Sequence, residues 1–269
     1  FPLRARHYAT HLQEENQRRL DRGDAPIPLD DTLTEARDVK AQSLIQPTHW
    51  PNIDLIGAQL NLYWAEFQVP VWRMQGRGWK LWDALTDVLD DDGILDDYDL
   101  VFIDTPPALG YLTINGLAAA DILLVPVGAS FLEFDSTGRF FDMLHTTFNS
   151  IEEGENLAAR ALGRPEMAFQ WDAVRAVVTR YDGSQQAELA GLMQAYLGKT
   201  LSPHRQDFTA LIGQAGEQVQ GIYEADYRDF NRETYVRGRE TFDATYAAFK
   251  ELLLGVWRRD ELAEERSDG

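Results

Sequence analysis

The stretch that most constrains the fold of this chain runs from residue 96 to residue 130 and reads DDYDLVFIDTPPALGYLTINGLAAADILLVPVGAS. Its apolar residues 100–103 show no period-2 alternation, which predicts a strand covered on both faces of a parallel sheet. Asp104 follows this strand directly. Because ligands of open α/β sheets bind at the carboxyl ends of the strands, the Asp104 carboxylate is placed to serve a site.

After Asp104 the sequence predicts a helix and a second strand. Residues 105–107, Thr-Pro-Pro, stop the first strand, a helix can run over 111–120, and residues 122–127 form another buried strand. A strand, a crossover helix and a strand within about 30 residues make a right-handed βαβ unit with parallel strands. The pattern therefore predicts an α/β fold.

Several features of this stretch together resemble a known family. The stretch contains hydrophobic residues that end in Asp-Thr-Pro-Pro, then a predicted helix of small residues that ends in Ala-Ala-Asp, then Leu-Leu-Val-Pro-Val. This order resembles the Walker B and switch II segment of ParA-type deviant P-loop ATPases, above all the plasmid-partition ParA/RepA branch. The resemblance implies that Asp104 is catalytic and holds Mg²⁺ through water. It makes Thr105, Pro106 and Pro107 candidates for binding ATP. Without the resemblance, Asp104 caps a helix or turn after a core strand.

Two further segments are similar to the same family. Residues 46–63 resemble a segment with a proline-led loop, a strand over 53–56 in the same sheet and a helix over 60–67. Residues 171–179 read as a β-branched strand, and the residues that follow resemble a Thr-x-Tyr-Asp motif whose loop helps to enclose the adenine. The resemblance implies a nucleotide-binding role for four residues, Thr179, Arg180, Tyr181 and Asp182. As bare residues after a strand, Arg180 and Tyr181 are also ordinary turn formers.

The Gly-rich phosphate loop of the family, of the form KGGxGKT, does not occur in this sequence. Gly198-Lys199-Thr200 imitates its end, but this tripeptide follows a predicted helix, whereas a phosphate loop leaves a strand and enters a helix. Since the chain opens on Phe1, one interpretation is a fragment that lacks the loop segment. The other is a complete chain that works without it.

Charge and composition exclude some classes of protein. The net charge is −19 and the isoelectric point is near 4.6, which argues against a protein that binds DNA phosphates over its whole surface. Arg228, Arg232, Arg237 and Arg239 nevertheless gather near the end, where relatives carry a DNA-binding strip, although ion pairs on a solvated helix are the alternative. The chain contains no cysteine and no apolar run long enough for a membrane span.

The resemblance implies a doubly wound, mostly parallel sheet flanked by helices, in a ParA-like α/β domain over residues 42–257. Residues 1–41 are expected to form a divergent or incomplete N-terminal segment, and residues 258–269 a charged tail. Apolar stripes predict helices over 79–89, 185–197 and 235–257. Asp135 and Ser136 are expected to cap a helix after the strand at 122–127. The polar residues 152–163 are expected to form an irregular surface segment.

Two functions follow from the resemblance. The first is a ParA-like partition or positioning ATPase, an ATP-dependent homodimer on nucleoid DNA that segregates a plasmid, a chromosome or other cargo. A ParB-like activator or cargo adaptor would be its partner, in the bacterial cytoplasm and not at a membrane. The second is a non-hydrolysing, ParA-like interaction module, a pseudo-ATPase, because the phosphate loop is absent from the sequence.

Overall fold

The computed structural model describes residues 17, 19, 20, 22, 40–74, 82–183, 186–218 and 220–267. The predicted N-terminal segment 1–41 therefore lies almost entirely outside the described residues. The chain forms two compact units, divided between Ala120 and Asp121. None of the helices in the described part of the chain is long and apolar enough to cross a membrane.

The first unit is mainly helical. Its helices are α3 (Trp64–Met74), α4 (Ala84–Asp91), α5 (Ile94–Asp97) and α6 (Tyr111–Ala118), with short turns η1 (Ala41–Leu44) and η2 (Leu60–Tyr63). Two strands of two residues each, β1 (Gln46–Pro47) and β2 (Asp54–Leu55), form an antiparallel hairpin. The helices predicted over 60–67 and 111–120 are confirmed.

A small apolar cluster holds α4 and α5 to the start of this unit. Val88 and Leu89 of α4 pack with Ala41 and Ile94, all of them buried. Asp92, in the acidic turn after α4, is only 2% exposed and accepts a 2.6 Å hydrogen bond from the Ala41 N–H. This buried carboxylate satisfies a backbone donor of η1 that would otherwise lose its hydrogen bond to water.

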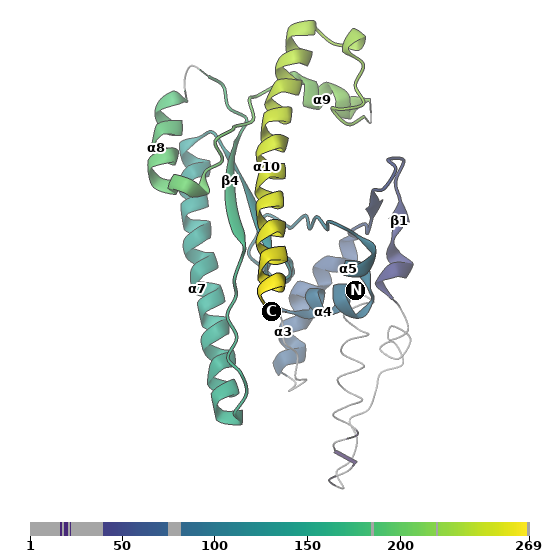
Figure 1. Ribbon diagram of the computed structural model, residues 1–269, viewed down its shortest axis with the longest axis vertical. Coiled ribbons are helices and arrows are strands. Elements are labelled where there is room, and N and C mark those ends of the chain that lie inside the picture. Colours follow the sequence, from purple (N-terminus) through teal and green to yellow (C-terminus); the bar gives the residue numbers. More distant parts are fainter. Residues whose placement is uncertain are drawn as a thin grey trace. The chain divides into compact units, whose positions relative to one another are not determined.

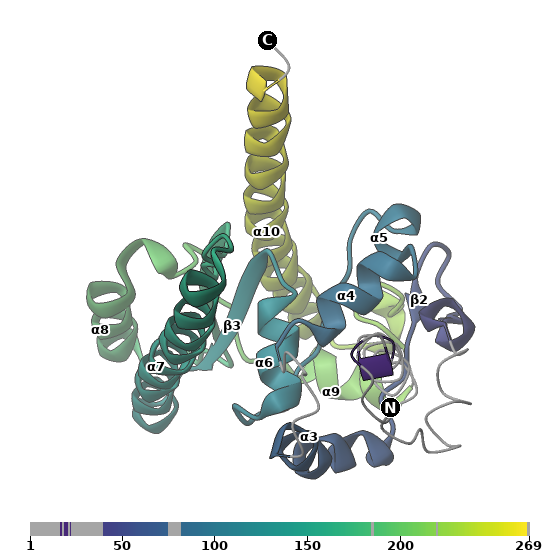
Figure 2. The ribbon, with the colours of Figure 1, turned by 90° about the horizontal axis from the view of Figure 1, so that it is seen from below.

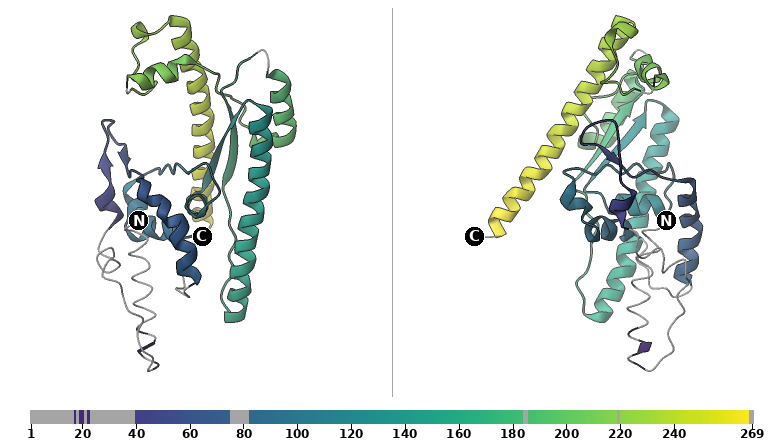
Figure 3. Two further views of the ribbon diagram at one scale, coloured as in Figure 1. Left: turned by 180° about the vertical axis from the view of Figure 1, so that it is seen from behind. Right: turned by 90° about the vertical axis from the view of Figure 1, so that its right-hand side faces the viewer.

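Within its described residues, the second unit contains a parallel strand pair, four α-helices and two short turns. These elements are β3 (Ile122–Gly128), α7 (Phe131–Leu162), β4 (Ala173–Thr179), α8 (Ala187–Leu197), η3 (Gly198–Thr200), α9 (Ala210–Glu217), η4 (Tyr227–Asp229) and α10 (Arg232–Ser267). Within this unit, α7 and α8 lie on one side of the strands and α10 on the other (Figures 1 and 2). Helix α9 packs beside the first turns of α10, as the two views of Figure 3 also show.

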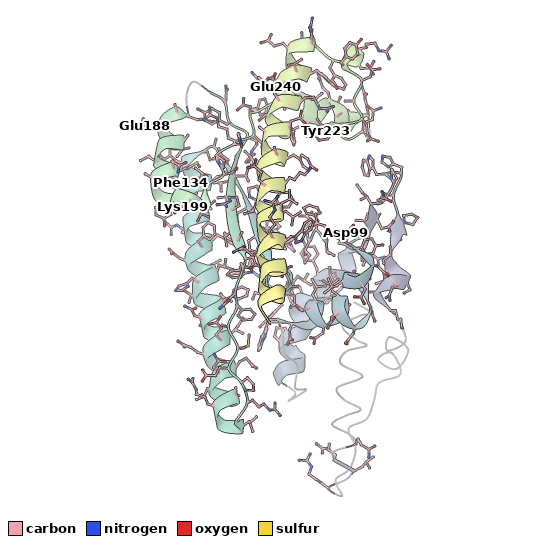
Figure 4. All side chains as sticks on the ribbon, in the orientation of Figure 1. Asp99, Phe134, Glu188, Lys199, Tyr223 and Glu240 are labelled. Carbon is pink, nitrogen blue, oxygen red and sulfur yellow. The ribbon has the colours of Figure 1, made fainter. Side chains whose placement is uncertain are left out.

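The strands β3 and β4 run parallel in a register that pairs Ile122 with Ala173 and Gly128 with Thr179. Their inward side chains join α8 in one buried core, which includes Val127, Ala176, Val178, Leu189 and Met193. The strands and the helix predicted over 122–127, 171–179 and 185–197 are confirmed. Gly198 ends α8 with a φ of +54°, so Gly198-Lys199-Thr200 follows a helix as predicted (Figure 4 labels Lys199).

Helix α7 corrects two expectations. Its N-cap is Ser130, whose hydroxyl accepts the Glu133 N–H at 3.2 Å, so Asp135 and Ser136 lie inside the helix rather than at its cap. The predicted irregular segment over 152–163 is wrong, because α7 continues to Leu162. Asn156 exchanges two hydrogen bonds with the Met167 backbone, and Phe148 packs edge-to-face against Phe169 and Trp171. The loop after α7 thus packs against the second half of the helix.

The predicted strand over 100–103 is also wrong, since these residues form no strand in the first unit. Phe102 is 71% exposed, and Leu100 and Val101 are exposed as well. A strand needs a hydrogen-bonded neighbour, and in the described part of the chain only the β1–β2 and β3–β4 pairs form sheets. The segment predicted at 53–56 likewise joins the β1–β2 hairpin instead of the parallel sheet.

Candidate functional site

The predicted site residues lie in both units. Asp104 and residues 105–107 belong to the first unit, and residues 179–182 belong to the second.

In the first unit, α6 holds the segment that carries Asp104. Gly116 of α6 faces Thr105 and Ile103 so closely that an added Cβ would lie 3.0 Å from the Thr105 Cγ2 and 3.1 Å from the Ile103 Cγ2. The absence of a side chain at Gly116 thus lets the backbone around Asp104 approach the helix. The buried Thr113 donates its hydroxyl to the Ala108 carbonyl and fixes the loop that follows. The Asp104 side chain itself is exposed.

A carboxylate distant in sequence caps the start of α6. The Glu66 carboxylate of α3 accepts hydrogen bonds from the backbone N–H groups of Tyr111 and Leu112, both at 2.7 Å. Gly110 makes room for this carboxylate, because a Cβ there would lie 2.6 Å from Oε2 of Glu66. A carboxylate at a helix N-terminus accepts hydrogen bonds from the free N–H donors and interacts favourably with the positive end of the helix dipole. Sequence reasoning missed Glu66, because no local pattern connects it to residues 45 positions away.

The first unit fits only part of a nucleotide site. Asp104 can supply the kind of carboxylate oxygen that Mg²⁺ prefers, but magnesium bound with a nucleotide also needs phosphate oxygens and waters. Among the described residues, no group of three His, Cys, Asp or Glu side chains is arranged to hold a metal ion. The phosphate-binding groups of a Gly-rich loop are absent from the sequence. Asp104 therefore offers a carboxylate for a metal ion, while the sequence contains no Gly-rich phosphate cradle.

In the second unit, predicted residues gather where the two parallel strands end. The Ala129 N–H donates to the Thr179 carbonyl at 3.1 Å and ties the chain after β3 to the end of β4. Helix α7 begins at once, so the Glu133 side chain of its first turn reaches back over Gly128. The Glu133 carboxylate forms an ion pair with the Arg180 guanidinium. This edge thus combines strand ends, a helix N-terminus and a charged pair.

The two residues after β4 have different environments. Arg180 adopts a left-handed backbone with a φ of +54°, and its side chain is 65% exposed. Tyr181 is only 4% exposed and belongs to the core, with the Arg205 guanidinium 3.8 Å from its ring centroid. Tyr181 therefore packs in the interior of the unit, while Arg180 is accessible to a ligand. Its neighbour Asp182 is exposed, and its N–H donates to Gln186 Oε1 at 2.8 Å.

Of the four arginines that the resemblance makes candidates for a DNA-binding strip, three have contacts within the second unit. Arg228 forms a bidentate pair with Asp226, and these hydrogen bonds lower the pKa of Asp226 to about 2. Arg237 donates to the Phe208 carbonyl at 2.8 Å. Arg239 lies over Tyr223, which Figure 4 labels, with 4.3 Å to the ring centroid. Arg232 is exposed in the first turn of α10.

Burial and a hydrogen bond to Asp243 raise the pKa of the Tyr223 hydroxyl. Tyr223 is thereby fastened to α10 at two points, through Asp243 and through Arg239. These contacts connect the loop after α9 to the long helix.

The chain is similar to several known proteins. Residues 11–156, more than half of the chain, match the model of an AAA domain family. A protein of Sinorhizobium fredii that bears the name replication protein A is 30% identical over 221 residues, which cover 80% of this chain and 51% of that protein. Protein SopA of Escherichia coli is 34% identical over 113 residues, which cover 40% of this chain and 28% of SopA.

Two solved structures share the fold. A structure described as a partition protein has a TM-score of 0.58 at 19% identity and covers 80% of this chain and 55% of its own. Apo McdA of Cyanthece has a TM-score of 0.55 at 20% identity and covers 78% of this chain and 73% of its own. The chain spans about half the length of the first two curated relatives it matches.

The family match also covers residues 104–107 and α6, so the segment on which the resemblance rests lies inside it. The chain therefore belongs to the ParA/RepA/SopA family of partition ATPases.

Proposed function

We propose that this chain serves as a nucleotide-dependent partition or positioning ATPase of its family. The observation that carries the proposal is the Asp-Thr-Pro-Pro segment, which presents an exposed Asp104 beside α6 in a chain that belongs to the family. When bound, magnesium would neutralise phosphate charge, and Asp104 would hold the ion through water. In the first unit, Thr105, Pro106 and Pro107 are the proposed nucleotide-binding residues. In the second unit they are Thr179, Arg180 and Asp182, which Tyr181 supports from the core of that unit.

The same proposal extends to partners. The family relationship supports a nucleotide-dependent homodimer on nucleoid DNA in the bacterial cytoplasm, with a ParB-like activator or a cargo adaptor. Arg232, exposed in the first turn of α10, is a candidate to contact DNA phosphates, whereas Arg228 before this helix is paired with Asp226. The proposed cargo is a plasmid, a chromosome or another large particle.

A second candidate is an interaction module that does not hydrolyse ATP. The specific feature in its favour is the sequence, which contains Asp104 but no KGGxGKT segment. Preorganised donors to a transferring phosphate are worth several kcal/mol, so a site without them loses most of its electrostatic stabilisation. In this candidate the chain binds partner proteins through the same α/β scaffold.

Titration calorimetry of the 269-residue chain with ATP and Mg²⁺ tests the choice. The ATPase proposal expects binding that Asp104→Ala weakens by about tenfold or more, because a ligand to the magnesium is lost. Asp99→Ala is the matched control, since Asp99 is also exposed and lies five residues earlier, so its loss should leave the affinity unchanged. Equal losses in both variants contradict a role for Asp104. Absence of binding contradicts nucleotide binding by these 269 residues alone, and is expected both of the interaction module and of a fragment that lacks the phosphate loop.

A further inference from the structure

The Glu133–Arg180 ion pair lies where ligands of parallel sheets bind. Gly128 ends β3 and pairs in register with Thr179, the last residue of β4, so Glu133 and Arg180 both lie beyond the carboxyl ends of these strands. Gly128 is necessary for this geometry. A Cβ there would collide with the Glu133 carboxylate and lie 2.7 Å from the Arg180 Nη2.

The backbone of Arg180 is held in an unusual conformation. A φ of +54° is costly for a residue other than glycine and persists only where the surroundings impose it. Here the neighbouring residues impose it. The Thr179 carbonyl accepts the Ala129 N–H, and Tyr181 exchanges backbone hydrogen bonds with Gln206 at 3.0 Å and Phe208 at 2.8 Å.

The ion pair contributes little to the stability of the folded state, so stability does not account for its position. The side chains of Arg180 and Glu133 are 65% and 41% exposed, and ion pairs this exposed add little stability because water screens them. The strained backbone instead directs a guanidinium over the strand ends. A guanidinium can pair with phosphate through two hydrogen bonds or stack on a base, so it suits a nucleotide.

Glu133 has a second partner. Its Oε2 lies 3.2 Å from the Ser130 hydroxyl, at the N-terminus of α7 where the helix dipole favours a negative charge. The carboxylate can therefore release Arg180 and remain stabilised by Ser130 and the helix end. In the structure the carboxylate contacts both partners at once, Ser130 through Oε2 and Arg180 through Oε1, so loss of the Arg180 contact leaves the Ser130 contact in place.

We propose that Glu133 is an autoinhibitory latch on Arg180. Arg180 is a nucleotide-binding residue of the second unit, and the Glu133 carboxylate competes with the nucleotide for its guanidinium. This inference rests on the proposed function, because the ligand is the nucleotide named there. The latch makes nucleotide affinity depend on a side chain of α7 that itself does not touch the ligand.

The test is a double-mutant cycle on ATP affinity, measured by calorimetry on the full chain with Mg²⁺. Glu133→Gln should tighten binding by about two- to fivefold, the range expected for an exposed ion pair. Arg180→Ala should weaken binding, and Glu133→Gln added to Arg180→Ala should produce no further change. Glu133→Ala, which removes the carboxylate altogether, should tighten binding as well.

Asp135→Asn is the matched control. Asp135 lies two residues further along α7, is exposed and pairs with Arg139 at 2.9 Å, so its loss removes one negative charge without touching Arg180. Equal tightening by Asp135→Asn, or tightening by Glu133→Gln that persists without Arg180, is a general charge effect and overturns the latch.

Other outcomes separate the latch from the proposed function. If the wild-type chain binds ATP and both Glu133→Gln and Glu133→Ala leave the affinity unchanged, the latch is wrong and the function stands. If neither the wild-type chain nor Glu133→Gln binds ATP, both are overturned. Binding that appears only in Glu133→Gln supports both.

Discussion

At the scale of single residues, Glu66 is the clearest stabilising contact of the first unit. Its carboxylate joins α3 to α6 through two short hydrogen bonds to helix-terminal N–H groups. Glu66→Ala should lower the free energy of unfolding by about 1–2 kcal/mol, because two donors lose a charged acceptor. Denaturant unfolding followed by circular dichroism measures this change.

The control for Glu66 is Glu153→Ala, because Glu153 is exposed on α7. This substitution should change the free energy of unfolding by less than about 0.5 kcal/mol. Gly110→Ala should act through the same contact, since its Cβ displaces the Glu66 carboxylate, so its effect should shrink in the Glu66→Ala background. Fully additive effects of Gly110→Ala and Glu66→Ala would contradict this account.

At the scale of elements, a glycine sets how closely α9 packs on α10. A Cβ at Gly238 would lie 2.7 Å from the Leu211 Cδ2 and 3.1 Å from the Thr209 Oγ1, and Leu211 is fully buried. Gly238→Ala should therefore destabilise the protein by about 1–2 kcal/mol, the cost of overpacking less the gain in helix propensity. Thermal unfolding measures the change.

Gly154 provides the opposite case. It lies inside α7, and a Cβ there meets no atom within 4 Å. Gly154→Ala should stabilise the chain by about 0.5–1 kcal/mol, because alanine loses less backbone entropy in a helix. Effects of the same sign at Gly238 and Gly154 would show that packing does not decide the outcome at α9 and α10.

At the scale of the whole molecule, the charge of −19 opposes compaction. Self-repulsion of a strongly charged chain destabilises its folded state, and salt screens it over about 10 Å at 0.1 M. Raising sodium chloride from about 0.02 M to about 0.5 M should therefore raise the thermal midpoint. Potassium chloride at the same concentrations should give the same shift, because screening depends on ionic strength and not on which monovalent cation is present. A midpoint that falls with salt would mean that attractive ion pairs outweigh the repulsion.

Much of the fold follows from local pattern. The strands at 122–128 and 173–179 and the helices at 111–118 and 187–197 were predictable, because apolar periodicity and turn residues are properties of neighbouring positions. The length of α7 was not predictable in the same way. Its second half depends on Phe169 and Trp171, which pack against Phe148 from the loop beyond the helix.

The residues of the candidate site were likewise only partly predictable from the sequence. The sequence by itself named Asp104, which follows an apolar segment that reads as a strand. Its resemblance to the family named Arg180 and predicted the family itself. Only the tertiary structure showed that Glu66 caps α6, that Glu133 holds Arg180 and that residues 100–103 have no strand partner in the first unit. The physical reason is that hydrogen bonds and ion pairs between residues some 45 positions apart form only once folding brings their backbones together.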